Sequence, residues 1–165
     1  MAVTSKIIHI EAPTSKVFNY LAEIQKHVEW SGELSFGLER VEKVTSGPLG
    51  VGSVFRSIGR LSALAGIEDT STITEIEPGH RLSWETVSRG TRQRHVFRWS
   101  YTLESENNST WLTYTLEMRR FRPMPLHLWF PPLLWLLDRA LFGREMEAGL
   151  EKIKLALERK VPLTH

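Results

Sequence analysis

The sequence predicts an α+β fold in which about seven antiparallel strands form a curved sheet around one long C-terminal helix. Turn clusters divide the middle of the chain into segments where apolar and polar residues alternate, as in half-buried strands. A short helical pattern follows the first strand, and an apolar stripe of helical period lies near the C-terminus. The 165 residues contain no repeats or linkers. We therefore assign residues 1–160 to one domain and residues 161–165 to a C-terminal tail.

The first strand and the short helices are predicted from the opening part of the chain. Residues 4–10 are rich in β-branched side chains, which favour a strand. Pro13 followed by Thr14 is a helix-start pattern. Apolar residues then recur at helical spacing, namely Val17, Phe18, Leu21 and Ile24. We expect a short helix here, with a second turn or helix running toward Trp30.

Six further strands are predicted in the middle of the chain. Turn clusters at residues 47–50, 77–80 and 106–109 separate segments at 38–45, 53–61, 67–76, 82–88, 92–104 and 110–118. Because short turns join consecutive strands, the sheet is expected to be mostly antiparallel. Two apolar files stand out, one of His95, Phe97, Trp99, Tyr101 and Leu103, the other of Leu112, Tyr114, Leu116 and Met118. One face of the sheet is thus predicted to be buried and aromatic, and the other solvated.

The final helix is predicted to cover that buried face. Its apolar stripe consists of Phe142, Met146, Leu150, Ile153 and Leu157, spaced by four, four, three and four positions. Such spacing places these residues along one side of an α-helix. A sheet that packs against one amphipathic helix buries both apolar surfaces.

Composition argues against several classes of function. The chain has 21 basic and 19 acidic residues, with the basic excess concentrated at Arg119, Arg120 and Arg122, so we expect no nucleic-acid partner. The absence of cysteine removes thiol catalysis, and the six histidines lack metal-ligand spacing. No cofactor-binding fingerprint is present, so we expect neither a metal nor an organic cofactor. Without cysteine or an apolar leader at residues 1–10, a cytoplasmic location is the expectation.

Four motifs in register connect the sequence to a known superfamily. Residues 10–21 contain the pattern apolar-x-Ala-Pro-x-x-x-Val-Phe, and Trp30 follows. Residues 50–53 form a glycine turn, residues 73–85 correspond to a central hairpin, and residues 111–114 to a last strand. By these motifs the chain resembles the START-like, or SRPBCC, superfamily with the helix-grip fold. Within that superfamily it looks like the polyketide cyclase/dehydrase and lipid transport group, over nearly its whole length.

The resemblance implies a cavity between the curved sheet and the C-terminal helix. Relatives carry sterols, phospholipids or plant hormones, cyclise aromatic polyketides, bind quinones or act as cochaperones, so the fold does not define the ligand. We expect binding or carriage of a hydrophobic small molecule, such as a lipid, an isoprenoid or an aromatic polyketide-like compound. The residues expected to line the cavity are Trp30, Trp84, Phe97, Trp99, Tyr101, Tyr114, Met118, Trp129, Leu133, Phe142, Met146, Gly149 and Leu150. Plain core packing is the competing explanation for many of them.

Gly149 bears on the choice between a cavity and a packed core. Inside a helix, glycine costs about 1 kcal/mol relative to alanine. Its position beside Leu150 on the buried stripe indicates either space for a ligand or close contact between helix and sheet. We interpret it as space for a ligand.

An enzyme that acts in the same cavity, a polyketide-type cyclase or dehydratase, is the alternative function. The resemblance implies an arginine and a few polar groups on apolar cavity walls. Arg56 and His95, both within predicted strands, are the candidate catalytic residues. The strand that contains Arg56 has two alternating sets, and either set fits an inward face.

A dense apolar segment precedes the last helix. Residues 124–142 are rich in Leu, Trp and Phe, are interrupted by Pro131 and Pro132, and follow three arginines. The uninterrupted part is shorter than the roughly 20 residues that a membrane-spanning helix needs. We favour a lid over the cavity, with a buried helix, a dimer interface or membrane-surface contact through residues 119–142 as alternatives. The last alternative predicts a membrane-peripheral lipid carrier. The sequence leaves open a monomer or a homodimer.

Overall fold

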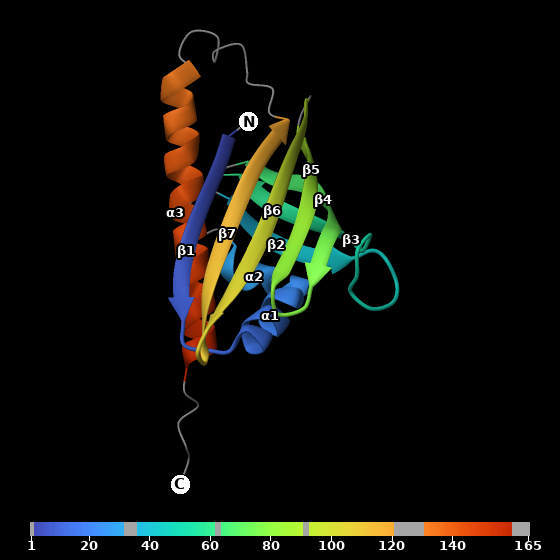
Figure 1. Ribbon diagram of the computed structural model, residues 1–165. Helices are drawn as coiled ribbons and strands as arrows, with labels where there is room; N and C mark the ends of the chain where they lie inside the picture. Colours follow the sequence, from blue (N-terminus) through green and yellow to red (C-terminus); the bar gives the residue numbers. More distant parts are fainter. Residues whose placement is uncertain (1, 32–35, 62–63, 91–92, 121–130, 160–165) are drawn as a thin grey trace.

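The computed structural model describes residues 2–31, 36–61, 64–90, 93–120 and 131–159, with side chains for most of them. Within these residues the chain forms one seven-stranded antiparallel sheet and a long C-terminal helix (Figure 1). The strands are β1 (Ala2–Ile10), β2 (Phe36–Lys43), β3 (Val54–Leu61), β4 (Leu64–Glu77), β5 (Arg81–Gly90), β6 (Gln93–Glu106) and β7 (Ser109–Arg120). The helices are α1 (Thr14–Ala22), the short 3-10 helix η1 (Ile24–Lys26), α2 (His27–Trp30) and α3 (Pro131–Glu158). The predicted fold class is confirmed.

The strand order explains how the short helices reach the concave face of the sheet. The order is β1-β7-β6-β5-β4-β3-β2, so β1 and β2 are opposite edges. Consecutive strands from β2 to β7 pair as predicted, whereas β1 pairs with β7 from Ala2–Met118 to Ile10–Thr110. The chain between the two edges forms α1, η1 and α2 near the lower end of the sheet in Figure 1. These helices and the later part of α3 cover the concave face at that end.

Two tight turns show why the predicted turn clusters end strands. Between β4 and β5, Gly79 has φ +78°, and the amide of His80 donates to the carbonyl oxygen of Glu77 over 2.9 Å. Between β6 and β7, Asn107 has φ +55°. Glycine and asparagine adopt this left-handed conformation at lower cost than other residues. The turn residues therefore fix the registers of both hairpins.

The hydrophobic core consists of a large and a small cluster. In the large cluster, α1, α2 and the later turns of α3 pack on the sheet around residues such as Leu21, Leu82 and Ile153. The small cluster is formed by Leu116 and Met118 of β7 with Met146 of α3. The predicted α3 stripe is confirmed, because its four later members are buried and Phe142 is half-buried.

Gly149 in α3 allows two helices to approach closely. A Cβ atom at this position would lie 2.9 Å from the backbone carbonyl oxygen of Trp30 in α2, a separation that real Cβ atoms essentially never show. The interpretation of Gly149 as space for a ligand is therefore wrong. Close packing is the correct explanation, although the partner is α2 rather than the sheet.

The start of α3 differs from the sequence expectation. Pro131 and Pro132, expected to interrupt the apolar segment, are the first residues of the helix. Proline is tolerated there because the first amides of a helix have no acceptor within it. Residues 121–130, on which much of the expected lid falls, lie outside the described residues.

Candidate ligand-binding site

The antiparallel register shows which residues share the concave face. Residues at paired positions on neighbouring strands belong to the same face of a sheet. From β3 to β7, one row of paired positions is Phe55, Ser71, Thr86, Phe97 and Met118. A second row is Ser57, Asp69, Ser88 and His95, and a third is Ile73, Trp84, Trp99 and Leu116. Because Phe55, Ile73 and Leu116 are buried, these rows face the core.

A closely packed aromatic cluster, made of His27, Trp30, Trp84 and Tyr101, occupies the concave face next to α2. The His27 ring centroid lies 4.8 Å from that of Trp30 and 5.5 Å from that of Trp84. Trp30 Nε1 donates a hydrogen bond to the Tyr101 hydroxyl over 3.2 Å. All four side chains are buried. Three predicted ligand-binding residues, Trp30, Trp84 and Tyr101, thus lie in a buried, packed region.

His27, which the sequence analysis did not select, is neutral in this cluster. Burial lowers its pKa to about 4, although a hydrogen bond to the backbone works in the other direction. The Nε2 atom lies 2.8 Å from the carbonyl oxygen of Leu21, so the neutral tautomer with a proton on Nε2 donates there. The sequence did contain a signal for its burial, because His27 lies at helical spacing between the apolar residues Ile24 and Trp30.

Four half-buried aromatic side chains form what we name the aromatic wall. They are Phe97 and Trp99 of β6, Tyr114 of β7 and Phe142 of α3. Trp99 and Tyr114 stack with centroids 5.7 Å apart, and Phe97 lies 6.3 Å from Trp99 and 6.5 Å from Phe142. The wall continues from the aromatic cluster toward the earlier part of α3. Unlike the cluster, it keeps part of its aromatic surface accessible.

A polar row, consisting of Ser57, Asp69 and Ser88, lies on the same face of β3, β4 and β5. Ser57 pairs with Asp69, and Asp69 pairs with Ser88. Both serines are buried and Asp69 is half-buried. The Ser88 hydroxyl donates a hydrogen bond to the Asp69 carboxyl group. Among the described residues, the buried Oδ1 atom of Asp69 has no hydrogen-bond partner.

The surroundings of Asp69 favour its protonated form. Burial raises its pKa above the ordinary value, and the hydrogen bond from Ser88 opposes this only in part. A buried polar atom without a partner costs about 1–3 kcal/mol, so such groups are uncommon in well-packed cores. Sequence analysis did not select Asp69. A signal was present, because Asp69 lies on the alternating file of Ile67 and Ile73 in a predicted strand.

The polar row adjoins the aromatic wall. Thr86 lies two residues before Ser88 on β5 and pairs directly with Phe97 of the wall. The Thr86 hydroxyl is hydrogen-bonded to that of Ser71 over 2.9 Å. An apolar surface with a few convergent polar groups beside it is the usual composition of a small-molecule site. We take the wall and the row together as the candidate site.

The other predicted ligand-binding residues have varied positions. Met118, Met146 and Leu150 are buried in the core, and Gly149 contacts α2. Leu133 lies in α3, but its side chain is outside the described part. Trp129 lies outside the described residues altogether.

The two predicted catalytic residues are separated by the register. Phe55 and Ser57 are buried, whereas Arg56 between them is exposed on the outer face. The structure therefore places Arg56 outside the candidate site, because alternate residues of a strand point to opposite faces. His95 occupies the position opposite Ser88, next to the polar row. Its side chain is not among those described.

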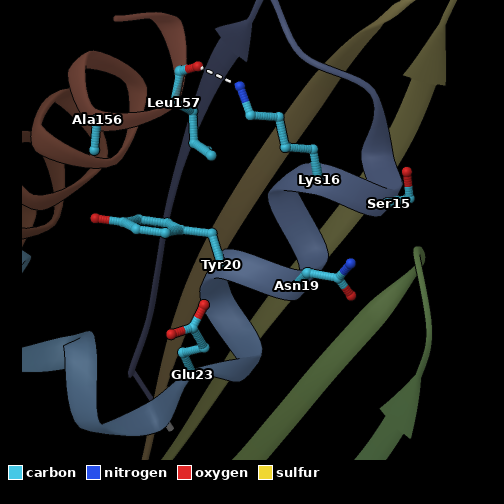
Figure 2. Close-up of a pocket in the computed structure, with 7 residues that line it drawn as sticks. All are labelled: Ser15, Lys16, Asn19, Tyr20, Glu23, Ala156 and Leu157. Atoms are coloured by element: carbon cyan, nitrogen blue, oxygen red, sulfur yellow. Dashed lines mark hydrogen bonds between the residues drawn. The ribbon is translucent and has the colours of Figure 1, made fainter. Parts of the chain in front are cut away.

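A separate groove lies between α1 and the last turns of α3 (Figure 2). It measures about 510 Å³ and is lined by Ser15, Lys16, Asn19, Tyr20, Glu23, Ala156 and Leu157. Lys16 Nζ donates to the carbonyl oxygen of Leu157 over 2.9 Å, which satisfies an end of α3. The Tyr20 hydroxyl donates a hydrogen bond to the carboxylate of Glu29. Burial, and to a lesser extent this carboxylate, raise the pKa of Tyr20 to about 12. The hydrogen bond from Lys16 stabilises the contact between α1 and α3. The groove itself is open and largely polar, so it does not resemble a hydrophobic site.

Over the described residues, no group of three or more His, Asp or Glu side chains could hold a metal ion. None of the described helices is both long and apolar enough to cross a bilayer.

The fold and the site together define a helix-grip protein with an aromatic concave face. A family model described as polyketide cyclase/dehydrase and lipid transport matches residues 1–158. The chain therefore belongs to this family, as the sequence resemblance predicts. No curated protein matches the sequence significantly.

Solved structures with the same fold come from several bacteria. The chain is similar to TTHA0849 from Thermus thermophilus, with 16% identity, a TM-score of 0.68, and coverage of 94% of this chain and 97% of that one. For protein CV1439 from Chromobacterium violaceum the identity is 12%, the TM-score 0.66, and the coverage 95% and 99%. For the Aha1 dimer from Colwellia psychrerythraea the identity is 18% and the TM-score 0.61, with coverage of 96% of this chain and 98% of that one. Identities this low show the shared fold alone.

Proposed function

We propose that the protein binds a hydrophobic small molecule against the aromatic wall, between the concave face of the sheet and α3. The observation that carries this proposal is the half-buried state of Phe97, Trp99, Tyr114 and Phe142 on a face that is elsewhere closely packed. Membership of a family named for polyketide cyclisation and lipid transport agrees with such a ligand. Lipid, isoprenoid and aromatic polyketide-like compounds all fit the chemistry of the wall.

The apolar surface that ligand and protein bury together sets the expected strength of binding. Removing about 300 Å² of apolar surface from water contributes roughly 7 kcal/mol, before the costs of association. After those costs, a dissociation constant on the order of micromolar is expected for a flat bicyclic aromatic compound. Stacking on Trp99 also predicts quenching of its fluorescence by a quinone.

The test is a fluorescence titration with 1,4-naphthoquinone, a flat aromatic quencher. We expect saturable quenching in the wild type and at least about tenfold weaker binding in Trp99→Ala, because the variant loses a stacking partner. The matched control is Trp111→Ala, since Trp111 is exposed on the outer face and its indole donates to Glu106. Equal affinity in all three proteins would overturn the proposal, provided circular dichroism shows that each is folded.

A cyclase or dehydratase that acts at the same place is the second candidate, and Asp69 favours it. An acid held neutral to higher pH than usual can donate a proton to a substrate oxygen. Arg56 contributes nothing to this mechanism, since it is exposed on the outer face. A linear poly-β-ketone would lose one water per cyclisation and dehydration, which mass spectrometry detects. Turnover that persists in Asp69→Asn would exclude Asp69 as the acid.

Three further expectations remain predictions. They are a single domain over residues 1–160, membrane-surface contact through residues 119–142, and a cytoplasmic location. A structural neighbour named as a dimer makes a homodimer worth testing beside a monomer. Liposome flotation of the wild type and of Trp129→Ala tests the membrane contact, and native mass spectrometry tests the oligomeric state.

A further inference from the structure

We propose that Asp69 is the polar anchor of the candidate site and donates a hydrogen bond to a carbonyl oxygen of the hydrophobic ligand. The inference rests on the proposed function and narrows it to aromatic or isoprenoid compounds that carry a ketone or quinone group. It starts from the one carboxyl oxygen in the polar row that has no partner among the described residues.

The hydrogen bonding of the row decides which atom is available. The Ser88 hydroxyl donates to the carboxyl group of Asp69, and because Oδ1 has no partner, Ser88 engages the other oxygen. In the protonated acid, a hydrogen on Oδ1 is then the free donor. Oδ1 is itself buried although the residue as a whole is half-buried, so the ligand oxygen must enter between Asp69 and what covers it.

The charges around Asp69 favour a neutral ligand group. The paired residues on β3 and β5 are the neutral hydroxyls of Ser57 and Ser88. Two titratable residues occupy the adjoining positions of the inner rows: His95 on β6, opposite Ser88, and Lys43 on β2, opposite Phe55. No described basic group pairs with Asp69 itself. A buried acid without a cationic partner is kept protonated, and a protonated acid donates to carbonyl oxygens rather than binding cations.

The position of Asp69 fits a ligand that also covers the aromatic wall. Phe97 of the wall pairs with Thr86, and Thr86 lies two residues before Ser88 on the same face of β5. Neighbouring strands are about 5 Å apart and neighbouring rows on one face about 7 Å, so Asp69, two strands and one row from Phe97, lies roughly 12 Å from it, a span that suits a linear tricyclic ring system rather than a bicyclic one. A tricyclic ligand that covers Phe97 and extends across Thr86 therefore brings an edge oxygen toward Asp69.

The experiment compares 1,4-anthraquinone, a linear tricycle with both oxygens on an end ring, with anthracene, which has the same rings without the oxygens. We expect the wild type to bind the quinone about tenfold more tightly than anthracene, and Asp69→Leu to lose that preference. Asp69→Asn, whose amide also donates, should restore most of the preference. The matched control is Glu68→Gln, because Glu68 precedes Asp69 and is exposed; it should behave as the wild type.

A second readout separates anchoring from a merely structural role. As the pH rises through the raised pKa of Asp69, ionisation removes the donor, so quinone affinity should fall while anthracene affinity stays level. Asp69→Asn should show no such fall. A quinone preference that is unchanged in Asp69→Leu overturns the anchor while leaving the proposed function intact. Failure of the wild type to bind either compound overturns both.

Discussion

His27 and Asp69 are both ionisable side chains on the inside of the same sheet, one beside α2 and the other in β4. Burial favours the neutral form of each, lowering the pKa of the imidazole and raising that of the carboxyl. They differ in how their polar atoms are satisfied. His27 has a carbonyl acceptor at 2.8 Å and aromatic rings around it, whereas Asp69 keeps a buried oxygen with no partner among the described residues.

We infer that this difference separates a structural region from the proposed binding region. In the aromatic cluster, His27 and Trp30 each make a hydrogen bond and all four side chains are buried, as in stable cores. The polar row around Asp69 retains an unsatisfied oxygen beside partly accessible aromatic rings. Sites that violate local rules of packing and polar satisfaction are commonly functional. The two ends of this apolar face are therefore expected to differ in role, and four measurements test that difference.

The largest expected effect compares Tyr101→Ala with Phe97→Ala. Tyr101 is 1% exposed and accepts a hydrogen bond from Trp30, so its removal leaves a cavity and an unpaired indole N–H. We expect a loss of about 4 kcal/mol in the free energy of unfolding. Phe97 is half-buried, and its removal should cost less than half as much. Urea unfolding measures both, and equal losses would remove the distinction between cluster and wall.

The second effect is the pH dependence of stability that His27 causes. Its pKa is about 4 in the folded protein, against 6.5 when unperturbed, so the unfolded chain binds the extra proton between these values. Its contribution is complete above pH 6.5 and decreases as the pH falls. The loss reaches about 3 kcal/mol near pH 4. Chemical denaturation across this range should show a shallower decline in His27→Gln, whereas His80→Gln, at an exposed position, should follow the wild type.

The third effect uses two glycines of α3 as a matched pair. In Gly149→Ala, the new Cβ would lie 2.9 Å from the backbone of α2, which cannot move aside cheaply. We expect a loss of about 2 kcal/mol despite the better helix propensity of alanine. In Gly143→Ala, the nearest atom is Cε of Lys6 at 3.3 Å, at the end of a flexible side chain. Stability should there be unchanged or increase by up to about 1 kcal/mol. A stabilised Gly149→Ala would contradict the close contact between the helices.

The smallest effect is the decrease in folding stability that the partly buried carboxyl group of Asp69 causes. A raised pKa means that the folded state binds more protons than the unfolded state above the ordinary pKa of 3.8. Stability should therefore fall as the pH rises through the folded pKa of Asp69. At neutral pH, Asp69→Leu should be about 1 kcal/mol more stable to unfolding than the wild type while losing its preference for quinones. Thermal unfolding of both proteins checks this, and a destabilised variant would indicate a structural role.

Periodicity predicted the framework because it reports which side of an element is buried. The α3 stripe and the facing of Tyr101 and Leu112 follow from apolar spacing, and the seven strands from that spacing together with turn clusters and β-branched residues. Gly149 was misread because the effect of a missing side chain depends on what lies opposite, and Trp30 is more than one hundred residues away along the chain.

The candidate site was only partly predictable for a related reason. Phe97, Trp99, Tyr114 and Phe142 are evident as large apolar residues at inward positions. Nothing local distinguishes them from Tyr101, since accessibility depends on how α2 and α3 cover the sheet. The polar row requires the registers of β3, β4 and β5 together, because Ser57, Asp69 and Ser88 become neighbours only through pairing.

The pairing of β1 with β7 has a consequence for synthesis of the chain. Ile10 pairs with Thr110 and Ala2 with Met118, so β1, the first strand to be synthesised, cannot pair until β7, the last strand, has been made. At the usual rates of translation, about 5–20 residues per second, this interval lasts on the order of ten seconds. During that time β2 to β6 can pair as successive hairpins, but the edge that receives β7 and then β1 stays open. Nascent chains stalled before residue 109 should therefore be the form most dependent on chaperones.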